Sequence, residues 1–230
     1  MNDYSFLEEL LDYKFSDKGL LLEALTHKSY SHEHKLSRNY ERLEFLGDAV
    51  LQLIVTEYLV AKYKQFDEGI LSKYRGYFVS EQFLSEMAKE IKLGDFVRLG
   101  KGEEQSGGKD KSSLLCDIFE SLVAALYIDG GYNCARSVVI NLSSDRIDET
   151  IDGNRFIDGK TELQKLTQKN FEQLPEYRIV SESGPEHDKV FVVEVIINGK
   201  SIAMGKGKSK KKAEQDAAKK ALLVLQKQDA

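Results

Sequence analysis

Apolar residues recur every three or four positions through most of residues 1–145. This spacing places them on one side of an α-helix and predicts an all-α region. The longest pattern runs from residue 40 to about 64 and is mostly apolar, so we expect this helix to be buried on more than one side. Shorter helices are predicted over 70–78, 80–91 and 112–128, the last of which should stop at Asp129-Gly130-Gly131.

Two segments of this region lack the helical pattern. The Gly-rich run at 100–111 predicts a surface loop, and the polar run at 143–154 predicts a linker or a fraying helix end. We therefore place a domain boundary near residue 150, which gives a first domain over 1–150 and a second over 156–228.

After this boundary the pattern predicts a small α+β domain. Helices are expected over 161–171 and after Ser209, an expected N-cap, with strands between them at 177–183, 190–197 and 200–205. Asn198-Gly199 is typical of a type I′ hairpin turn. The order α-β-β-β-α predicts two helices on one face of a three-stranded antiparallel sheet.

The net charge of −5 conceals a difference between the two parts. From residue 156 onward the chain carries 14 Lys and Arg against 11 Asp and Glu, whereas the preceding part carries 19 against 27. The basic excess is concentrated in GKGKSKKK, residues 205–212. Positive charge focused on one face allows a protein of negative net charge to bind a polyanion.

Several protein classes are excluded by composition. The acidic N-terminus does not resemble a signal peptide, and the apolar runs are too short to span a membrane. Cys116 and Cys134 form no metal-ligand pattern and fit a reducing compartment. We therefore expect a cytoplasmic protein without membrane contact.

Two predicted helices carry pairs of acids with no base nearby. Glu44 and Asp48 stand four positions apart in ERLEFLGDAVL (41–51), and Asp117 and Glu120 three apart in LLCDIFESLVAALYI (114–128). Each pair shares one side of its helix, and no Lys or Arg stands three or four positions from any of these acids. Solvated helix faces are the alternative, but these acids are isolated among Leu, Ile, Phe and Ala.

Four ionised carboxylates brought together would repel one another by an amount on the order of several kcal/mol. Divalent cations with a preference for oxygen ligands, Mg²⁺ or Mn²⁺ rather than zinc, would relieve this repulsion. Beside a nucleic-acid-binding domain, such a site favours metal-assisted phosphodiester chemistry. His27, His32 and His34 lack a further matching ligand, and we expect a capping or packing role for His27.

The last predicted helix begins with Lys210 and Lys211, where the helix dipole and free N–H groups also attract phosphate. A solvated Lys-rich helix start is the alternative. Because the predicted strands carry no row of aromatic residues for stacking bases, the pattern favours recognition of duplex RNA by shape. The other candidate contacts are Thr161, Gln164, Gln168 and the loop from Gly184 to His187.

These motifs resemble the bacterial ribonuclease III family over nearly the whole chain. ERLEFLGDAVL is similar to that family's signature run, and LLCDIFESLVAALYIDGG to its second acidic helix. KTELQKLTQ, GPEHDKVFVVEV and GKGKSKKKAEQDAAKKAL are similar to its double-stranded RNA-binding domain. The resemblance implies an endoribonuclease that cleaves duplex RNA to 5′-phosphate and 3′-hydroxyl ends, without a small-molecule substrate, in processing of ribosomal RNA precursors, mRNA, tRNA and other structured RNA.

The resemblance also implies residue roles. Metal binding is implied for Glu44, Asp48, Asp117 and Glu120, and catalytic roles for Asp48, Glu120, Glu41 and Glu68. The helix dipole alone also favours acids at helix starts, where the last two stand. Phe45 matches an aromatic residue that inserts into a partner subunit, which implies a homodimer with two cleavage centres and short 3′ overhangs in the product.

The departures from the family pattern are small. Cys116 replaces a small residue, Lys165 replaces an acid, and YRGYF follows Leu71-Ser72 in place of a commoner run. None removes a catalytic group. Two other classes are weighed against this interpretation: a non-catalytic dimer that binds duplex RNA would lack one or more acids, and a di-iron helical protein would need Glu-x-x-His pairs, which are missing.

Overall fold

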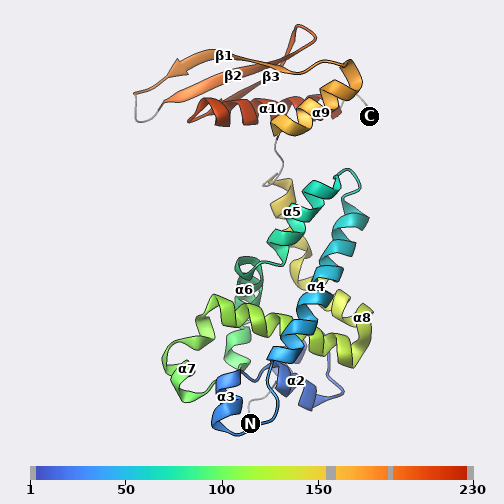
Figure 1. The fold of residues 1–230 in the computed structure, drawn as a ribbon, viewed down its shortest axis with the longest axis vertical. Coiled ribbons are helices and arrows are strands. Elements are labelled where there is room, and N and C mark those ends of the chain that lie inside the picture. The colour runs from blue at the N-terminus through green and yellow to red at the C-terminus, as the bar shows by residue number, and fades with distance from the viewer. Residues whose placement is uncertain (1–3, 154–158, 186–188, 227–230) are drawn as a thin grey trace. The chain divides into compact units, whose positions relative to one another are not determined.

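The computed structural model describes residues 4–153, 159–185 and 189–226. The chain forms two compact units, residues 1–155 and 156–230. The first is built of helices and the second combines a sheet with helices (Figure 1). The predicted fold class, an all-α domain followed by a small α+β domain, is confirmed.

The first unit contains both α-helices and short 3₁₀ helices. In chain order they are α1 (Ser5–Leu11), α2 (Lys18–Ala24), α3 (Lys28–Glu33), α4 (Glu41–Lys62), α5 (Glu68–Phe78), α6 (Glu81–Glu90), η1 (Leu93–Phe96), α7 (Lys101–Gln105), η2 (Gly108–Asp110) and α8 (Ser112–Asp152).

The core of this unit lies around α4 and α8. The α8 helix packs against α2, α4 and α6, while α4 also packs against α5. Leu51 and Ile54 of α4 and Ile118 and Ala124 of α8 are almost completely buried. Both sequences are apolar on more than one side because each helix contacts several neighbours.

Two segments differ from the prediction. Gly131, at φ 80° and ψ 176°, interrupts α8, but the chain then resumes a helix that continues to Asp152. The interpretation of 143–154 as a linker or fraying helix end is therefore wrong for its described part, because Ser143, Ile147 and Ile151 recur every four positions and are buried. The predicted loop at 100–111 contains α7 and η2.

The second unit has the predicted α-β-β-β-α order. Its elements are α9 (Gly159–Phe171), β1 (Glu176–Ser183), β2 (Val190–Ile197), β3 (Lys200–Gly207) and α10 (Lys210–Gln226). The strands form an antiparallel sheet in the order β1-β2-β3, with both helices on one face (Figure 1).

Local signals explain this unit well. Asn198 and Gly199 have φ of 51° and 71°, and positive φ at both central positions is what a type I′ turn requires. Ser209 accepts a hydrogen bond from the backbone N–H of Lys212 at 3.2 Å, as expected of an N-cap. The core between sheet and helices comprises Leu163, Val195, Ile197, Ala217, Ala218, Ala221 and Leu225.

Candidate active site and RNA-binding surface

A close crossing of α4 and α8 brings the two predicted acid pairs together. Gly47, between Glu44 and Asp48, is buried against the backbone of Glu120. A Cβ atom at position 47 would lie 1.8 Å from the carbonyl oxygen of Glu120, so a side chain does not fit there. We refer to the carboxylates gathered by this crossing as the acid cluster: Glu44, Asp48, Asp117 and Glu120.

Burial and mutual repulsion disfavour negative charge in the acid cluster. Glu120 is 9% exposed, and burial, followed by the charges of Asp48, Asp117 and Glu44, raises its pKa to about 7. Burial is also the main cause that raises the pKa of Glu44 and of Asp117. A cation in this position would offset both effects.

The acid cluster offers only oxygen donors, which fits Mg²⁺ or Mn²⁺. Among the residues that the structure describes, however, no three His, Cys, Asp or Glu side chains already form a group that could hold a metal ion. The Asp48 carboxylate accepts a hydrogen bond from the Gln52 amide at 2.9 Å, and the Cys116 sulfur lies 3.8 Å from Oε1 of Glu120. The chemistry of the donors therefore fits a divalent cation, while binding one requires these side chains to reorient.

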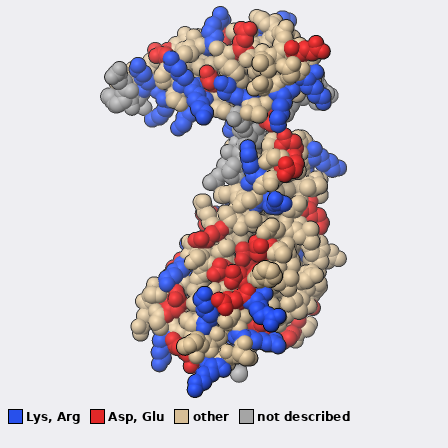
Figure 2. Space-filling view, in the orientation of Figure 1, with Lys and Arg blue, Asp and Glu red and all other residues tan. Residues whose placement is uncertain are grey.

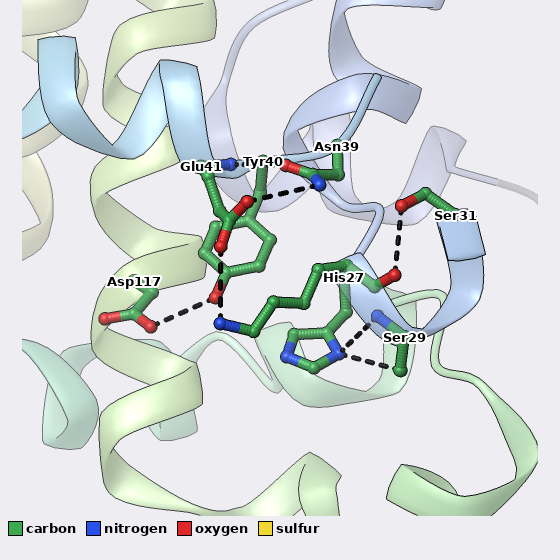
Figure 3. A network of polar contacts seen from close by, with 8 residues as sticks. His27, Ser29, Ser31, Asn39, Tyr40, Glu41 and Asp117 are labelled. Carbon is green, nitrogen blue, oxygen red and sulfur yellow. Dashed lines mark hydrogen bonds and ion pairs between the residues drawn. The ribbon is translucent and has the colours of Figure 1, made fainter. Parts of the chain in front are cut away.

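The segment that leads into α3 contacts the start of α4 (Figure 3). His27 caps α3 by accepting a hydrogen bond from the Ser29 N–H, and its ring stacks on Tyr40 with centroids 5.4 Å apart. The expected capping and packing role of His27 is confirmed, and burial lowers its pKa. Tyr40 in turn donates to Oδ2 of Asp117 at 3.3 Å.

Glu41 is exposed at the first residue of α4, beside this contact. Its carboxylate receives the Lys28 ammonium at 3.2 Å and the Asn39 amide at 3.4 Å. Lys28 also opposes the raised pKa of Glu44 and Asp117. A base does therefore approach the acid cluster, but from another helix rather than from three or four positions along the same one.

Glu68 and Phe45 belong to a different surface. Phe45 is 83% exposed and begins an exposed stripe on α4 with Ala49, Leu53 and Val60. Glu68 lines a pocket of about 280 Å³ between α4 and α5, together with Thr56, Leu59, Val60, Leu71, Ser72 and Arg75. Val60 stands twelve residues beyond Asp48, about 18 Å along a helix, so one chain does not bring Glu68 to the acid cluster.

The predicted RNA contacts within the described residues are exposed. Thr161, Gln164 and Gln168 lie on one side of α9, and Lys210 and Lys211 begin α10. Figure 2 shows Lys and Arg side chains along the margin of this unit, whereas a group of Asp and Glu side chains lies on the visible face of the first unit.

Two observations bear on the predicted RNA contacts of the second unit. Lys210 lies 3.5 Å from Glu182, so part of its charge is compensated within the chain. His187 lies outside the described residues.

Sequence reasoning missed Gly47, Tyr40 and Lys28. A signal existed for Gly47, because glycine inside a helix costs about 1 kcal/mol relative to alanine and such a residue often permits close packing. No sequence signal connects Tyr40 with Asp117, since they stand 77 positions apart and meet only through the fold.

Two family models match the chain. Residues 17–145 match a model described as Ribonuclease-III-like, and residues 160–225 match one described as double-stranded RNA binding motif. The first match contains the acid cluster, and the second contains every described candidate for RNA contact.

Similar proteins extend these matches over nearly the whole chain. The chain is 48% identical to ribonuclease 3 of Caldanaerobacter subterraneus over 222 residues, which covers 96% of this chain and 97% of that protein. It is 47% identical to ribonuclease 3 of a Sulfurovum species over 227 residues, covering 99% and 100%.

A solved structure of the ribonuclease III nuclease domain from Campylobacter jejuni is 43% identical to this chain, with a TM-score of 0.59. The match covers 65% of this chain and 97% of that one. A second structure of that domain is 44% identical to this chain, with a TM-score of 0.58. The match covers 61% of this chain and 95% of that one, and that structure is described as flexible in a region involved in dimer formation.

Proposed function

Because the chain belongs to the ribonuclease III family and is an endoribonuclease of that type, we propose that it hydrolyses double-stranded RNA with Mg²⁺, for which Mn²⁺ can substitute. The products would be 5′-phosphate and 3′-hydroxyl ends. The observation that carries this proposal is the acid cluster, in which three carboxylates have raised pKa values and no Lys or Arg stands three or four positions away along the same helix.

We assign metal binding to all members of the acid cluster and catalytic roles to Asp48, Glu120, Glu41 and Glu68. The bound metal would lower the pKa of an attacking water and stabilise the leaving oxygen. The chain itself positions the carboxylates through the contact of Gly47 with α8, and burial of Glu120 limits the access of water to its carboxylate.

The second unit would hold the duplex by its shape. Lys210 and Lys211 would contact phosphates, while Thr161, Gln164 and Gln168 would contact the minor groove with its 2′-hydroxyl groups. Their exposure and shared domain support this role. His187, also a candidate, lies outside the described residues.

We also propose that two chains form a homodimer through the exposed stripe of α4. In a two-fold dimer the same surface serves both subunits, so Phe45 of each chain would fill the partner's pocket beside Glu68. Leu53 is 56% exposed and lies midway along α4 between Phe45 and the pocket, so it would lie near the two-fold axis of the dimer. This arrangement would bring Glu68 of each subunit close to the other's acid cluster and provide two cleavage centres for one duplex.

The cellular role is a further part of this proposal. We assign the nuclease domain to residues 1–150 and the RNA-binding domain to 156–228, and we place the protein in the cytoplasm, acting on ribosomal RNA precursors, mRNA, tRNA and other structured RNA. Of the described helices, none is both long and apolar enough to cross a membrane.

The test is cleavage of labelled duplex RNA by wild type and Glu120→Gln, with Mg²⁺ and with EDTA. We expect Glu120→Gln to lose cleavage by at least about a thousandfold, since a metal ligand is removed, while RNA binding persists. Glu149→Gln, at an exposed position of the same helix, is the matched control and should cleave normally.

Cleavage by the wild type in EDTA, or normal turnover of Glu120→Gln, would contradict the metal assignment. Duplex binding without any cleavage by the wild type would instead identify a non-catalytic RNA-binding dimer.

A further inference from the structure

Tyr40 connects the start of α4 to a member of the acid cluster on α8. Its side chain is 3% exposed, and its hydroxyl donates to Oδ2 of Asp117 at 3.3 Å. The proposed function above gives Asp117 a metal to bind but leaves Tyr40 without a role. A buried hydroxyl directed at a carboxylate of this kind can restrict how the carboxylate turns.

The surroundings of Tyr40 restrict its own movement. One face of its ring stacks on His27 at an interplanar angle of 11°. The His27 ring is itself held by Ser29, whose hydroxyl lies 2.8 Å from Nδ1. The backbone N–H of Tyr40 donates a hydrogen bond to the carbonyl oxygen of Thr26 at 3.0 Å. The backbone and the ring of Tyr40 are therefore both held by the segment that leads into α3.

We propose that Tyr40 is a positioning residue for the metal site, which orients the Asp117 carboxylate through its hydroxyl. This inference rests on the proposed function, because it assumes that Asp117 binds a metal. Tyr40 itself contacts neither metal nor RNA in this proposal. Residues 26–29 contribute by holding the tyrosine ring in place.

The reason lies in the freedom of an aspartate on a helix. A carboxylate that accepts a hydrogen bond at one oxygen loses rotational freedom before the metal arrives, so less is lost when the metal binds. Removal of partners that orient metal ligands typically weakens metal binding by about 10- to 100-fold. Since the Tyr40 bond is long for an O–H···O contact, we expect an effect near the lower limit.

The experiment measures binding of Mn²⁺ to the full chain without RNA by isothermal titration calorimetry. Tyr40→Phe keeps the ring and its contact with His27 but removes the hydroxyl. We expect its Mn²⁺ affinity to fall about tenfold. Cleavage should then require correspondingly more metal, while kcat at saturating metal changes by less than about twofold.

Tyr63→Phe is the matched control. Tyr63 is also a buried tyrosine of the α4 region whose hydroxyl donates to an aspartate of α8, in this case Asp148. Its loss should lower the melting temperature but leave Mn²⁺ affinity unchanged. In an Asp117→Asn background, Tyr40→Phe should have no further effect on Mn²⁺ affinity, because the two residues act through one contact.

Several results would overturn this role. Wild-type Mn²⁺ affinity in Tyr40→Phe would exclude it, as would an equal loss in Tyr63→Phe or an undiminished effect in the Asp117→Asn background. Failure of the proposed function itself is distinguishable, because the wild type would then not cleave duplex RNA with metal.

A second measurement needs no substitution at residue 40. In wild-type protein labelled with 3-fluorotyrosine, binding of Mg²⁺ should shift a ¹⁹F resonance that persists in labelled Tyr63→Phe. If saturating Mg²⁺ shifts no tyrosine resonance, the contact between Tyr40 and a metal-binding carboxylate is refuted, whether or not Tyr40→Phe folds.

Discussion

The α4 and α8 helices place acids at two sites with opposite electrostatic surroundings: four carboxylates together at one, and a single aspartate among donors at the other. Near the start of α4, burial and like charges raise the pKa of three members of the acid cluster. At the C-terminal end of α4, Asp148 of α8 accepts hydrogen bonds from Tyr58 at 3.0 Å, from Tyr63 and from Lys62. Although burial opposes its charge, these donors hold the pKa of Asp148 below its usual value.

The difference separates an acid that the fold stabilises in its charged form from acids to which we assign a metal in the proposed function. The Asp148 site, formed by Asp148, Tyr58, Lys62 and Tyr63, has a cation and two hydroxyl donors within the chain. The acid cluster brings four carboxylates together around one glycine contact, and the donors Tyr40, Gln52 and Cys116 are uncharged and each contact a different carboxylate. Folding therefore provides Asp148 with donors that lower its pKa, whereas the pKa values in the acid cluster stay raised, which fits the cation that we propose for it.

The largest expected effect comes from separating the helices that form the acid cluster. Gly47→Ala places a Cβ atom 1.8 Å from the Glu120 carbonyl oxygen, so α4 and α8 must move apart. We expect a loss of about 3 kcal/mol or more in the free energy of unfolding, and loss of cleavage. Urea denaturation and the cleavage assay measure the two effects.

Gly76→Ala provides the control for this substitution. Gly76 lies in α5, and a Cβ atom there would meet nothing within 4 Å. Its replacement should stabilise the protein by up to about 1 kcal/mol, because alanine favours a helix. If Gly47→Ala were as harmless as Gly76→Ala, the close crossing would not be what assembles the acid cluster.

The next effect concerns the satisfied site. Asp148→Asn removes the charge that three donors share, and we expect a loss of about 2 kcal/mol in unfolding free energy at pH 7. Most of this loss should come from the hydrogen bonds of the two tyrosines, because Lys62 is 45% exposed and solvent screens its ion pair with Asp148. Mn²⁺ affinity should not change, which separates this site from the acid cluster.

The pH dependence of this loss follows from the direction of the pKa shift. A carboxyl group with a lowered pKa stabilises the fold above its unfolded-state pKa, near 4, and the benefit is lost as the pH falls through its folded value. The gap between wild type and Asp148→Asn should therefore shrink below about pH 4. A constant gap from pH 3 to 7 would argue that the charge of Asp148 is irrelevant.

The two sites also differ in how far the sequence reveals them. The acid cluster is predictable because two apolar helices each carry an acid pair with no base three or four positions away. The Asp148 site was not predicted, since 143–154 was interpreted as a linker or fraying helix end. The spacing of Ser143, Ile147 and Ile151 did carry a helical signal, but two isoleucines in a polar run are weak support.

What the sequence cannot provide is the set of contacts between distant segments. The hairpin at Asn198-Gly199 and the cap at Ser209 depend on neighbouring residues and were predicted correctly. The contact of Tyr40 with Asp117 depends on how α4 crosses α8, which no local pattern determines. The same holds for the approach of Lys28 to Glu41.

An effect of similar size and opposite sign is expected within the acid cluster. The pKa of Glu120 is raised to about 7, so its protonated form is favoured in the fold. Its contribution to stability is complete below the unfolded-state value near 4.3 and is lost as the pH rises through about 7. Without metal at pH 8, Glu120→Gln should therefore be more stable than wild type, by roughly 2 kcal/mol.

Urea denaturation in EDTA at pH 8 and pH 4 measures this difference. The advantage of Glu120→Gln should nearly vanish at pH 4, where the wild-type carboxyl is mostly protonated in both states. Saturating Mg²⁺ at pH 8 should reverse the order, because only the wild type keeps the full set of ligands. A destabilised Glu120→Gln in EDTA at pH 8 would show that the acid cluster is satisfied without metal.

The smallest expected effect tests Lys28, the base of α3 that approaches the acid cluster. Lys28 forms an ion pair with Glu41 in which both side chains are about half exposed, so Lys28→Ala should hardly change stability. Its charge nevertheless opposes the burial and the neighbouring acids that raise the pKa of Glu44 and Asp117. Removing it makes the surroundings more negative, so Mn²⁺ should bind about two- to threefold more tightly, opposite to Tyr40→Phe.

Calorimetry at low and high salt decides whether this gain is electrostatic. At roughly 0.01 M ionic strength the Debye length is about 30 Å, and the gain should be largest; near 1 M it falls to about 3 Å and the gain should disappear. Lys14→Ala, which removes an exposed base between α1 and α2, should leave Mn²⁺ affinity unchanged at both salt concentrations. Weaker Mn²⁺ binding by Lys28→Ala would mean that Lys28 organises the carboxylates rather than competing with the cation for their charge.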